Sequence, residues 1–204
     1  GLNKPFGVAV DPAKNVYSVD KNDRVVQLPA GRKTEQVVLF GAEAPNGIAV
    51  DSVGNVYVTE CLRHRVVKLV AGSNVQQVLG FTALGCLGGV AVDSTGSVYV
   101  TESWSDRVVK LTPESGVQQV FSFNHDLGLV NAAAVAVDPA GNLYVTDSFD
   151  HKGYQVIELA SGMRVPRVMP FSGLNGPSGV AVDSVGNVYV ADYGNNRVVK
   201  LSAE

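Results

Sequence analysis

The stretch from Pro177 to Leu201 decides the fold of this chain. It reads PSGVAVD at Pro177–Asp183, GNVYV at Gly186–Val190 and NRVVKL at Asn196–Leu201. The first run recurs, intact or nearly so, four times earlier in the chain, at Gly7–Asp11, Gly47–Asp51, Gly89–Asp93 and Ala134–Asp138. Successive copies begin 40 to 45 residues apart, so the chain consists of five internal repeats.

Each repeat predicts a meander of short β-strands. The first run is followed by a turn, by a second run such as Val56–Val58 and by a third such as Arg65–Leu69. A fourth run follows in the first four repeats, at Gln36–Phe40, Gln76–Phe81, Gln118–Phe123 and Pro166–Phe171. Valine-rich runs bounded by Gly, Asn, Asp and Ser are typical of strands joined by tight turns. No window has the 3.6-residue period of a helix.

Four antiparallel strands at a period of about 42 residues make one blade of a β-propeller. We therefore predict an all-β fold, a β-propeller of five four-stranded blades in which the last blade lacks its outer strand. The chain forms one domain, 1–204, with blades at approximately 4–41, 42–82, 83–124, 125–172 and 173–204. Neighbouring blades pack face to face, which explains why apolar residues run almost continuously along the strands.

The missing outer strand leaves two interpretations of the ring open. The ring closes with five blades, the last of them three-stranded, or the chain is a piece or an engineered derivative of a larger propeller. In either case the unpaired strand edge invites self-association through the last blade.

The motif Pro-x-Gly-Val-Ala-Val-Asp, then Gly-Asn-Val-Tyr-Val, then Asn-Arg-Val-Val-Lys-Leu resembles the NHL repeat, and its fullest copy spans Pro177–Leu201. The Leu-Asn-x-Pro-x-Gly linker and the run Val168–Phe171 resemble the extracellular sensor domain of the PknD family of mycobacterial serine/threonine kinases. That resemblance implies a ligand-sensing module on the extracellular or cell-envelope side of a membrane, tethered in the full-length protein by a transmembrane helix. The sensor of that family has six blades, whereas this chain has five repeats.

Charge and cysteine content narrow the possible partners. The chain carries 16 Lys and Arg against 19 Asp and Glu, a net charge of −3, which disfavours nucleic acid as a partner. No apolar run approaches the ~18 residues that span a membrane. Cys61 and Cys86 both fall on the same predicted face, where they form either a disulfide or two free thiols. A disulfide would favour an oxidising, extracytoplasmic compartment.

The candidate binding surface is the face that carries the links between strands two and three and the links between blades. The strand residues of the repeat are nearly the same in all five copies, whereas the loop residues on this face differ from one repeat to the next. Large apolar side chains gather on this rim: Phe6, Leu62, Trp104, Phe149 and Tyr193. Aromatic residues on loops are typical of contact surfaces. The rim therefore binds a small ligand or a protein, or else its side chains cap the core.

Two sets of repeated polar residues are interpreted as structural. An acidic residue ends strand two and an arginine begins strand three, as in Glu60 and Arg65, and this pair recurs in four of the five repeats. The fourth repeat departs from the pattern, with Asp147 followed by Gln155. The aspartates that end the first run are expected to cap turns by accepting main-chain hydrogen bonds.

Catalysis has little support in the sequence. Similar propellers that are lyases or lactonases hold a metal ion or a His/Glu set over the central channel, whereas the inner strands here carry Val, Ala and Ile. The histidines are His64, His125 and His151, scattered over different repeats. We therefore expect no metal, no cofactor and no catalytic residue. The expected function is non-catalytic ligand or protein binding, with an interaction scaffold as the first alternative and a metal-dependent lyase or hydrolase as the second.

Overall fold

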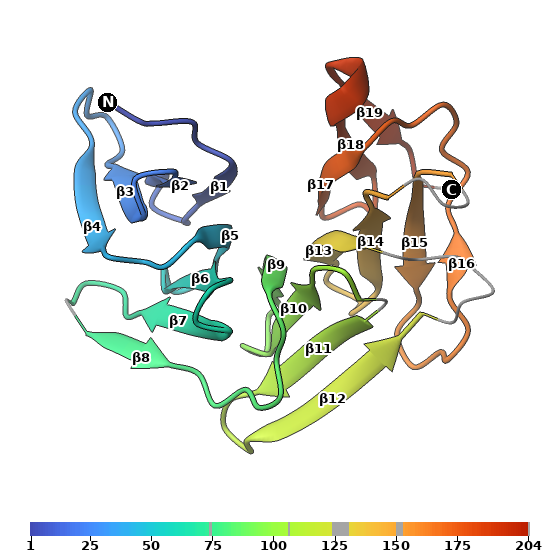
Figure 1. Cartoon of the computed structure of the whole chain (residues 1–204), viewed down its shortest axis with the longest axis horizontal. Helices are drawn as coiled ribbons and strands as arrows, with labels where there is room; N and C mark the ends of the chain where they lie inside the picture. Colours follow the sequence, from blue (N-terminus) through green and yellow to red (C-terminus); the bar gives the residue numbers. More distant parts are fainter. Residues whose placement is uncertain (74, 106, 124–130, 150–152, 204) are drawn as a thin grey trace.

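The computed structural model describes residues 1–73, 75–105, 107–123, 131–149 and 153–203. Five small antiparallel sheets stand as blades around a common axis (Figure 1). The first four sheets each contain four strands in meander order, and the fifth contains three. The predicted all-β propeller with a three-stranded last blade is confirmed.

The strands follow the repeat. Blade one contains β1 (Gly7–Val10), β2 (Val16–Asp20), β3 (Arg24–Leu28) and β4 (Gln36–Phe40). Blade two contains β5 (Pro45–Val50), β6 (Val56–Glu60), β7 (Arg65–Leu69) and β8 (Gln76–Val78). Blade three contains β9 (Leu87–Val92), β10 (Val98–Glu102), β11 (Arg107–Thr112) and β12 (Val117–Ser122). Blade four contains β13 (Ala132–Val137), β14 (Leu143–Asp147), β15 (Gln155–Leu159) and β16 (Arg167–Val168). Blade five contains β17 (Pro177–Val182), β18 (Val188–Asp192) and β19 (Arg197–Leu201), with a single 3-10 turn, η1 (Tyr193–Asn195), before β19.

Alternate side chains along each strand serve two different interfaces, because successive residues of a strand point to opposite faces. In β6, Val56 and Val58 pack against blade one, whereas Tyr57 between them packs against blade three. The same division recurs at the interfaces between blades three and four and between blades four and five. We call the face toward the preceding blade the N-side face and the face toward the following blade the C-side face. Apolar residues on both faces are therefore required by the stacking.

Glycines in the first strands let neighbouring blades approach closely around the axis. A β-carbon added at Gly47 would lie 2.8 Å from the carbonyl oxygen of Gly88 in the next blade. One added at Gly89 would lie 2.9 Å from the α-carbon of Ala134. Real β-carbons do not approach main chain so closely, so the glycines of the repeat set the spacing of the inner strands.

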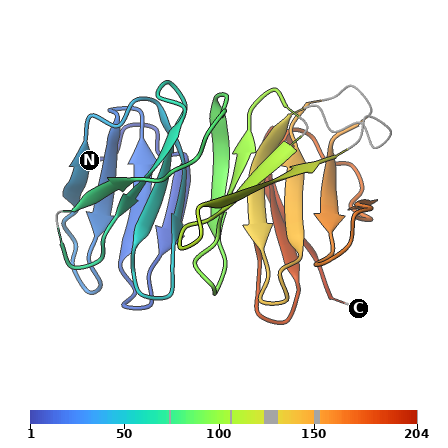
Figure 2. The same ribbon diagram turned by 90° about the horizontal axis from the view of Figure 1, so that it is seen from below.

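The five blades form an open arc and not a closed ring. β17 and β1 stand apart at its two ends in Figure 1, and the side view in Figure 2 shows the blades upright beside one another. Extensive contacts join each first strand to the next, from β1 to β5, β9, β13 and β17 in turn. Val8 of β1 and Val198 of β19 are exposed at the two ends. The interpretation in which five blades close the ring is therefore wrong, because the first and last blades do not pack against each other as the other neighbours do.

A glycine substitution tests the close approach of the blades. We expect Gly89→Ala to lower the free energy of unfolding by about 1–3 kcal/mol, because its methyl group would force β9 and β13 apart. Gly80→Ala is the matched control, since Gly80 has open space around its α-carbon and no positive φ angle. Urea denaturation of both variants measures the difference, and equal stabilities would contradict the packing described here.

Candidate binding site on the top face

The loops between second and third strands lie beside the links that enter the first strands, and together they form what we call the top face. A main-chain hydrogen bond joins the two in each of the first four blades. In each case the amide N–H of the loop residue donates to the carbonyl oxygen of the link residue, at 2.8–3.2 Å: Lys21 to Asn3, Cys61 to Ala44, Ser103 to Cys86 and Ser148 to Asn131. Blade five has an equivalent bond from Gly194 to Asn175 at 2.8 Å. The fold therefore fixes the loop bases in the same way throughout the arc.

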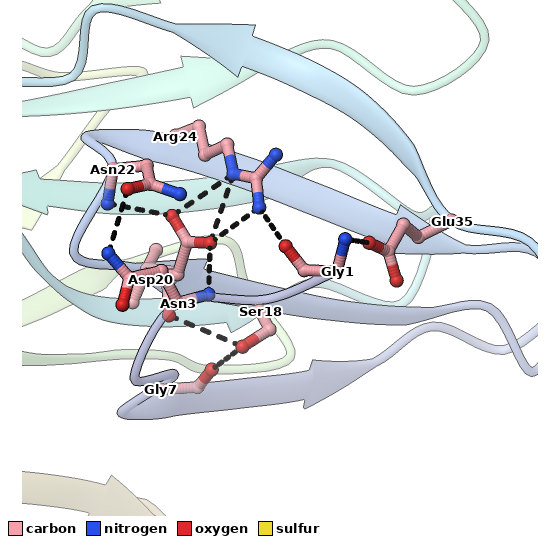
Figure 3. A network of polar contacts seen from close by, with 9 residues as sticks. Gly1, Asn3, Gly7, Ser18, Asp20, Asn22, Arg24 and Glu35 are labelled. Atoms are coloured by element: carbon pink, nitrogen blue, oxygen red, sulfur yellow. Dashed lines mark hydrogen bonds and ion pairs between the residues drawn. The ribbon is translucent and has the colours of Figure 1, made fainter.

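A buried carboxylate reinforces each of these junctions, as Figure 3 shows for Asp20 in blade one. Asp20 accepts main-chain hydrogen bonds from Asn3 and Asn22, both at 3.0 Å. It also accepts the Nε–H of Arg24, whose Nη2 in turn donates to the carbonyl oxygen of Gly1 at 2.6 Å. The carboxylate thus ties the strand end, the loop and the link into the blade together.

The same arrangement recurs in three further blades. Arg65 pairs with Glu60, Arg107 with Glu102, and Arg197 with Asp192. In each pair the acidic side chain is buried. These residues form the junction between strands and loops, as the sequence interpretation expected. Blade four has Gln155 at the position of the arginine. Its Asp147 still accepts main-chain hydrogen bonds from Asn131 at 3.1 Å and from Phe149 at 3.2 Å, as Asp20 does from Asn3 and Asn22.

The electrostatics of the junction favour the ionised carboxylate. Burial alone raises the pKa of Asp20, but hydrogen bonds from Arg24, Asn3 and Asn22 outweigh it and hold the pKa below its ordinary value of 3.8. The pKa of Asp192 is lowered in the same way, with burial opposed by hydrogen bonds from Asn195, Asn175 and Arg197. These groups are charged at neutral pH and act as fixed anchors.

The two cysteines lie on the top face and are joined by a disulfide. Their α-carbons are 4.3 Å apart, and the bond closes a loop across 25 residues. Cys61 opens the loop of blade two, and Cys86 lies in the link that enters blade three. The disulfide therefore ties the loop of blade two covalently to the link that enters blade three.

Trp104 and Phe149 are the two rim side chains that the structure brings together. Their ring centroids are 5.6 Å apart, with the rings at 72° in an edge-to-face arrangement. Trp104 is 71% exposed, and its main chain has φ +63°, a conformation that bulky residues rarely adopt. The tryptophan is thus presented to solvent from a constrained backbone.

Asn131 positions this aromatic pair, a role that was not predicted from the sequence. Its side-chain oxygen accepts a hydrogen bond from the Trp104 amide at 3.0 Å. Its Nδ2 donates to the hydroxyl of Ser148, next to Phe149, at 2.9 Å. Blades two and three have Ala44 and Cys86 in the equivalent place, but blades one and five have Asn3 and Asn175, so the residue type alone did not distinguish Asn131.

The other three rim residues occupy separate places. Phe6 lies at a central cavity of about 450 Å³ that is lined by the first strands and, in blade five, also by Tyr189 and Val198. Leu62 and Tyr193 are both strongly exposed on their own loops. Within the described part of the chain no ring contact joins them to the Trp104–Phe149 pair. Among the described residues, the ring contact of the rim is therefore the one between Trp104 and Phe149.

No group of three or more His, Cys, Asp or Glu side chains suited to a metal ion occurs among the described residues. His64 is in the loop of blade two, and His125 and His151 lie outside the described residues. In the same described ranges, no helix has the length and apolar character needed to cross a membrane.

Comparisons with known proteins agree with this architecture. Residues 174–201 match the NHL repeat, and residues 42–59 match a beta-propeller repeat. Among curated proteins, no sequence matches the chain.

Solved structures share the fold at low identity. A catalytically inactive virginiamycin B lyase from Staphylococcus aureus with quinupristin has TM-score 0.75 and 13% identity, covering 98% of this chain and 67% of its own. A gluconolactonase from Xanthomonas campestris has TM-score 0.80 and 18% identity, covering 98% and 73%. A nidogen/laminin complex has TM-score 0.70 and 22% identity, covering 89% and 76%. These similarities show the propeller fold alone, and the resemblance to the PknD sensor stays a prediction.

The lowered pKa of Asp20 makes a prediction about acid stability. Because the pKa is lower in the folded state, the ionised carboxylate stabilises the fold above its unfolded value, and this contribution is lost as pH falls below about 3.8 through the folded pKa. We expect Asp20→Asn to be less stable than the parent at pH 7 and to lose this part of the pH dependence.

The exposed carboxylate Glu114 provides the matched control as Glu114→Gln. Thermal melts of the parent and both variants between pH 2 and 7 measure the effect. A stability gap for Asp20→Asn that stays constant down to pH 2 would contradict the role of the charge.

Proposed function

We propose that this propeller is a non-catalytic binding module whose top face holds a small ligand or a protein through Trp104 and Phe149. The observation that carries the proposal is the geometry of this pair. An exposed tryptophan is held by a hydrogen bond from its own amide to Asn131 and by an edge-to-face contact, in a backbone conformation that is unfavourable for it. Constrained backbones of this kind cluster at ligand-binding sites.

Several features of the pair suit recognition. Tryptophan and phenylalanine offer large contact areas with few rotatable bonds, so little conformational entropy is lost when a partner binds. The loops that carry them are attached to a rigid junction of buried charges and main-chain hydrogen bonds. A preorganised surface on a rigid frame is the arrangement typical of binding loops.

A more specific role follows from the disulfide and from the sequence resemblance. A Cys61–Cys86 disulfide is stable in an oxidising compartment, which favours the extracellular or cell-envelope side of a membrane. We therefore propose that the module senses a ligand outside the cell as part of a receptor serine/threonine kinase. The chain itself would then be a soluble domain that is tethered in the full-length protein.

An enzymatic function has no comparable observation behind it. Two of the structural neighbours are a lyase and a gluconolactonase. In the described part of this chain, however, the central cavity is lined by Gly, Ala, Val, Ile, Ser, Asn, Phe and Tyr, without acidic, histidine or cysteine side chains. The lining therefore offers no carboxylate or imidazole to act as a general base or as a charged metal ligand.

Trp104 is the single tryptophan of the chain, so its intrinsic fluorescence reports directly on the proposed site. We expect its emission to change saturably when the protein is titrated with fractionated cell-envelope extract and then with the purified active component. Phe149→Ala should weaken that binding at least tenfold, because it removes the edge contact that orients the indole. Val53→Ala, an exposed turn residue between β5 and β6, should bind like the parent.

The stability of Trp104→Ala separates binding from capping of the core. If Trp104 is an exposed binding residue, its replacement by alanine should change the free energy of unfolding by less than about 1 kcal/mol. A loss of about 3 kcal/mol or more, as for a buried tryptophan, would show that the side chain caps the core and would overturn the proposal.

A further inference from the structure

We propose that the two end faces of the arc receive one or two further four-stranded blades of the same repeat. One end face is the C-side face of blade five, formed by Ala181, Tyr189, Ala191 and Val198. The other is the N-side face of blade one, formed mainly by Val8 and Val10. The inference concerns an interaction surface distinct from the aromatic rim and does not depend on the rim's function.

The C-side face of blade five has the sequence of an internal interface but not its burial. Val198 is 71% exposed, whereas the residues at its position in the four other blades are all fully buried at 0%: Val25, Val66, Val108 and Val156. Tyr189 is half-buried, whereas Tyr57 and Tyr99 are buried against the next blade. Blade five therefore presents a surface that is covered everywhere else in the molecule.

The N-side face of blade one shows the same contrast. Val8 is 69% exposed, whereas Ile48, Val90 and Val135 at the equivalent position are 6–8% exposed. Val10, two residues further along β1, is also exposed. Terminal repeats that face solvent need a polar outer surface. At both ends, the main positions of the exposed face instead hold apolar residues, as they do in blades that have a neighbour on both sides.

The glycine at position 179 is evidence for a following blade that does not rest on the exposed fractions of side chains. Gly7, Gly47 and Gly89 are at the same position in earlier blades, and a β-carbon at each would come within about 3 Å of the next blade. A β-carbon at Gly179 would meet only Ala191 of its own blade, at 3.5 Å. Glycine is thus present in blade five although no described residue requires it.

The outer edge of β19 indicates which kind of strand the occupant should place beside it. In the other four blades the third strand pairs with a fourth strand, and one apolar pair is common to all: Val26 with Val37, Val67 with Val78, Val109 with Val120, and Ile157 with Val168. The equivalent residue of β19 is Val199, whose outer edge has no strand partner in the described structure. The occupant should therefore supply an antiparallel strand with a valine opposite Val199.

The size of the opening limits the occupant. The chain covers about two thirds to three quarters of the larger propellers that share its fold, which leaves room for about two blades of this length. A second copy of the chain brings five blades and would collide with the first copy if it continued the same arc. One or two further blades would complete a propeller of the size of these neighbours, whereas the five blades of a second copy would exceed it.

Cysteine reactivity tests the proposal, because the natural cysteines form a disulfide and leave no free thiol. Val198→Cys and Val8→Cys should react rapidly with iodoacetamide in the 204-residue chain. The extended chain repeats residues 112–201 after Leu201, which adds a fourth strand for blade five, then one four-stranded blade and one three-stranded blade in phase. In that chain both reactions should slow at least tenfold. Val185→Cys, in an exposed turn of blade five, is the control and should react equally in both chains.

The outcomes separate the occupants. Equal reactivity of Val198→Cys in both chains would overturn the proposal. A shorter extension with residues 112–159 adds the fourth strand of blade five and one three-stranded blade. Failure of both extended chains to melt in a single cooperative transition would also overturn the proposal. Light scattering should give a monomer for the 204-residue chain. A dimer in which Val198→Cys is protected would show that a second copy occupies the face instead.

Discussion

The structure depends on face-to-face packing between blades. A four-stranded sheet of this composition has apolar side chains on both faces, and no blade can bury both by itself. Tyr57 and Val58 are adjacent in β6, yet they belong to two different interfaces. Glycines such as Gly47 and Gly89 bring the inner strands close enough for these interfaces to form. Each pair of neighbouring blades therefore adds to the stability of the fold, and the blade at each end of the arc has one apolar face without a neighbouring blade.

A second layer of interactions separates this packing from the loops above it. Buried carboxylates such as Asp20 and Glu60 bind the arginine of the next strand and the link between blades. Because the junction holds every loop base, the residues beyond it are free to vary without loss of the fold. Blade four departs from the pattern, and Phe149 in its loop meets Trp104. The least regular junction thus lies beside the proposed binding pair.

The sequence predicted the repeats, the strands and the three-stranded last blade, since these follow from local patterns of valine, tyrosine and turn residues. It also identified the acid–arginine pairs as structural. It left the choice between a closed ring and an open arc undecided, because closure depends on the angle between blades, which is set by contacts far apart in the chain. The positioning role of Asn131 was not predictable either, because it acts through a link that only the fold brings beside two loops.

The most direct test of the central claim is hydrogen–deuterium exchange of the 204-residue chain, resolved by blade. If protection depends on packing on both faces, amides of β10 in blade three should exchange far more slowly than those of β18 in blade five. The two strands have nearly the same sequence, VYVTE and VYVAD, and each is paired on both edges, so the comparison removes differences in intrinsic exchange rate and in direct strand pairing. The account predicts at least a tenfold difference in protection, and equal protection of β10 and β18 would contradict it.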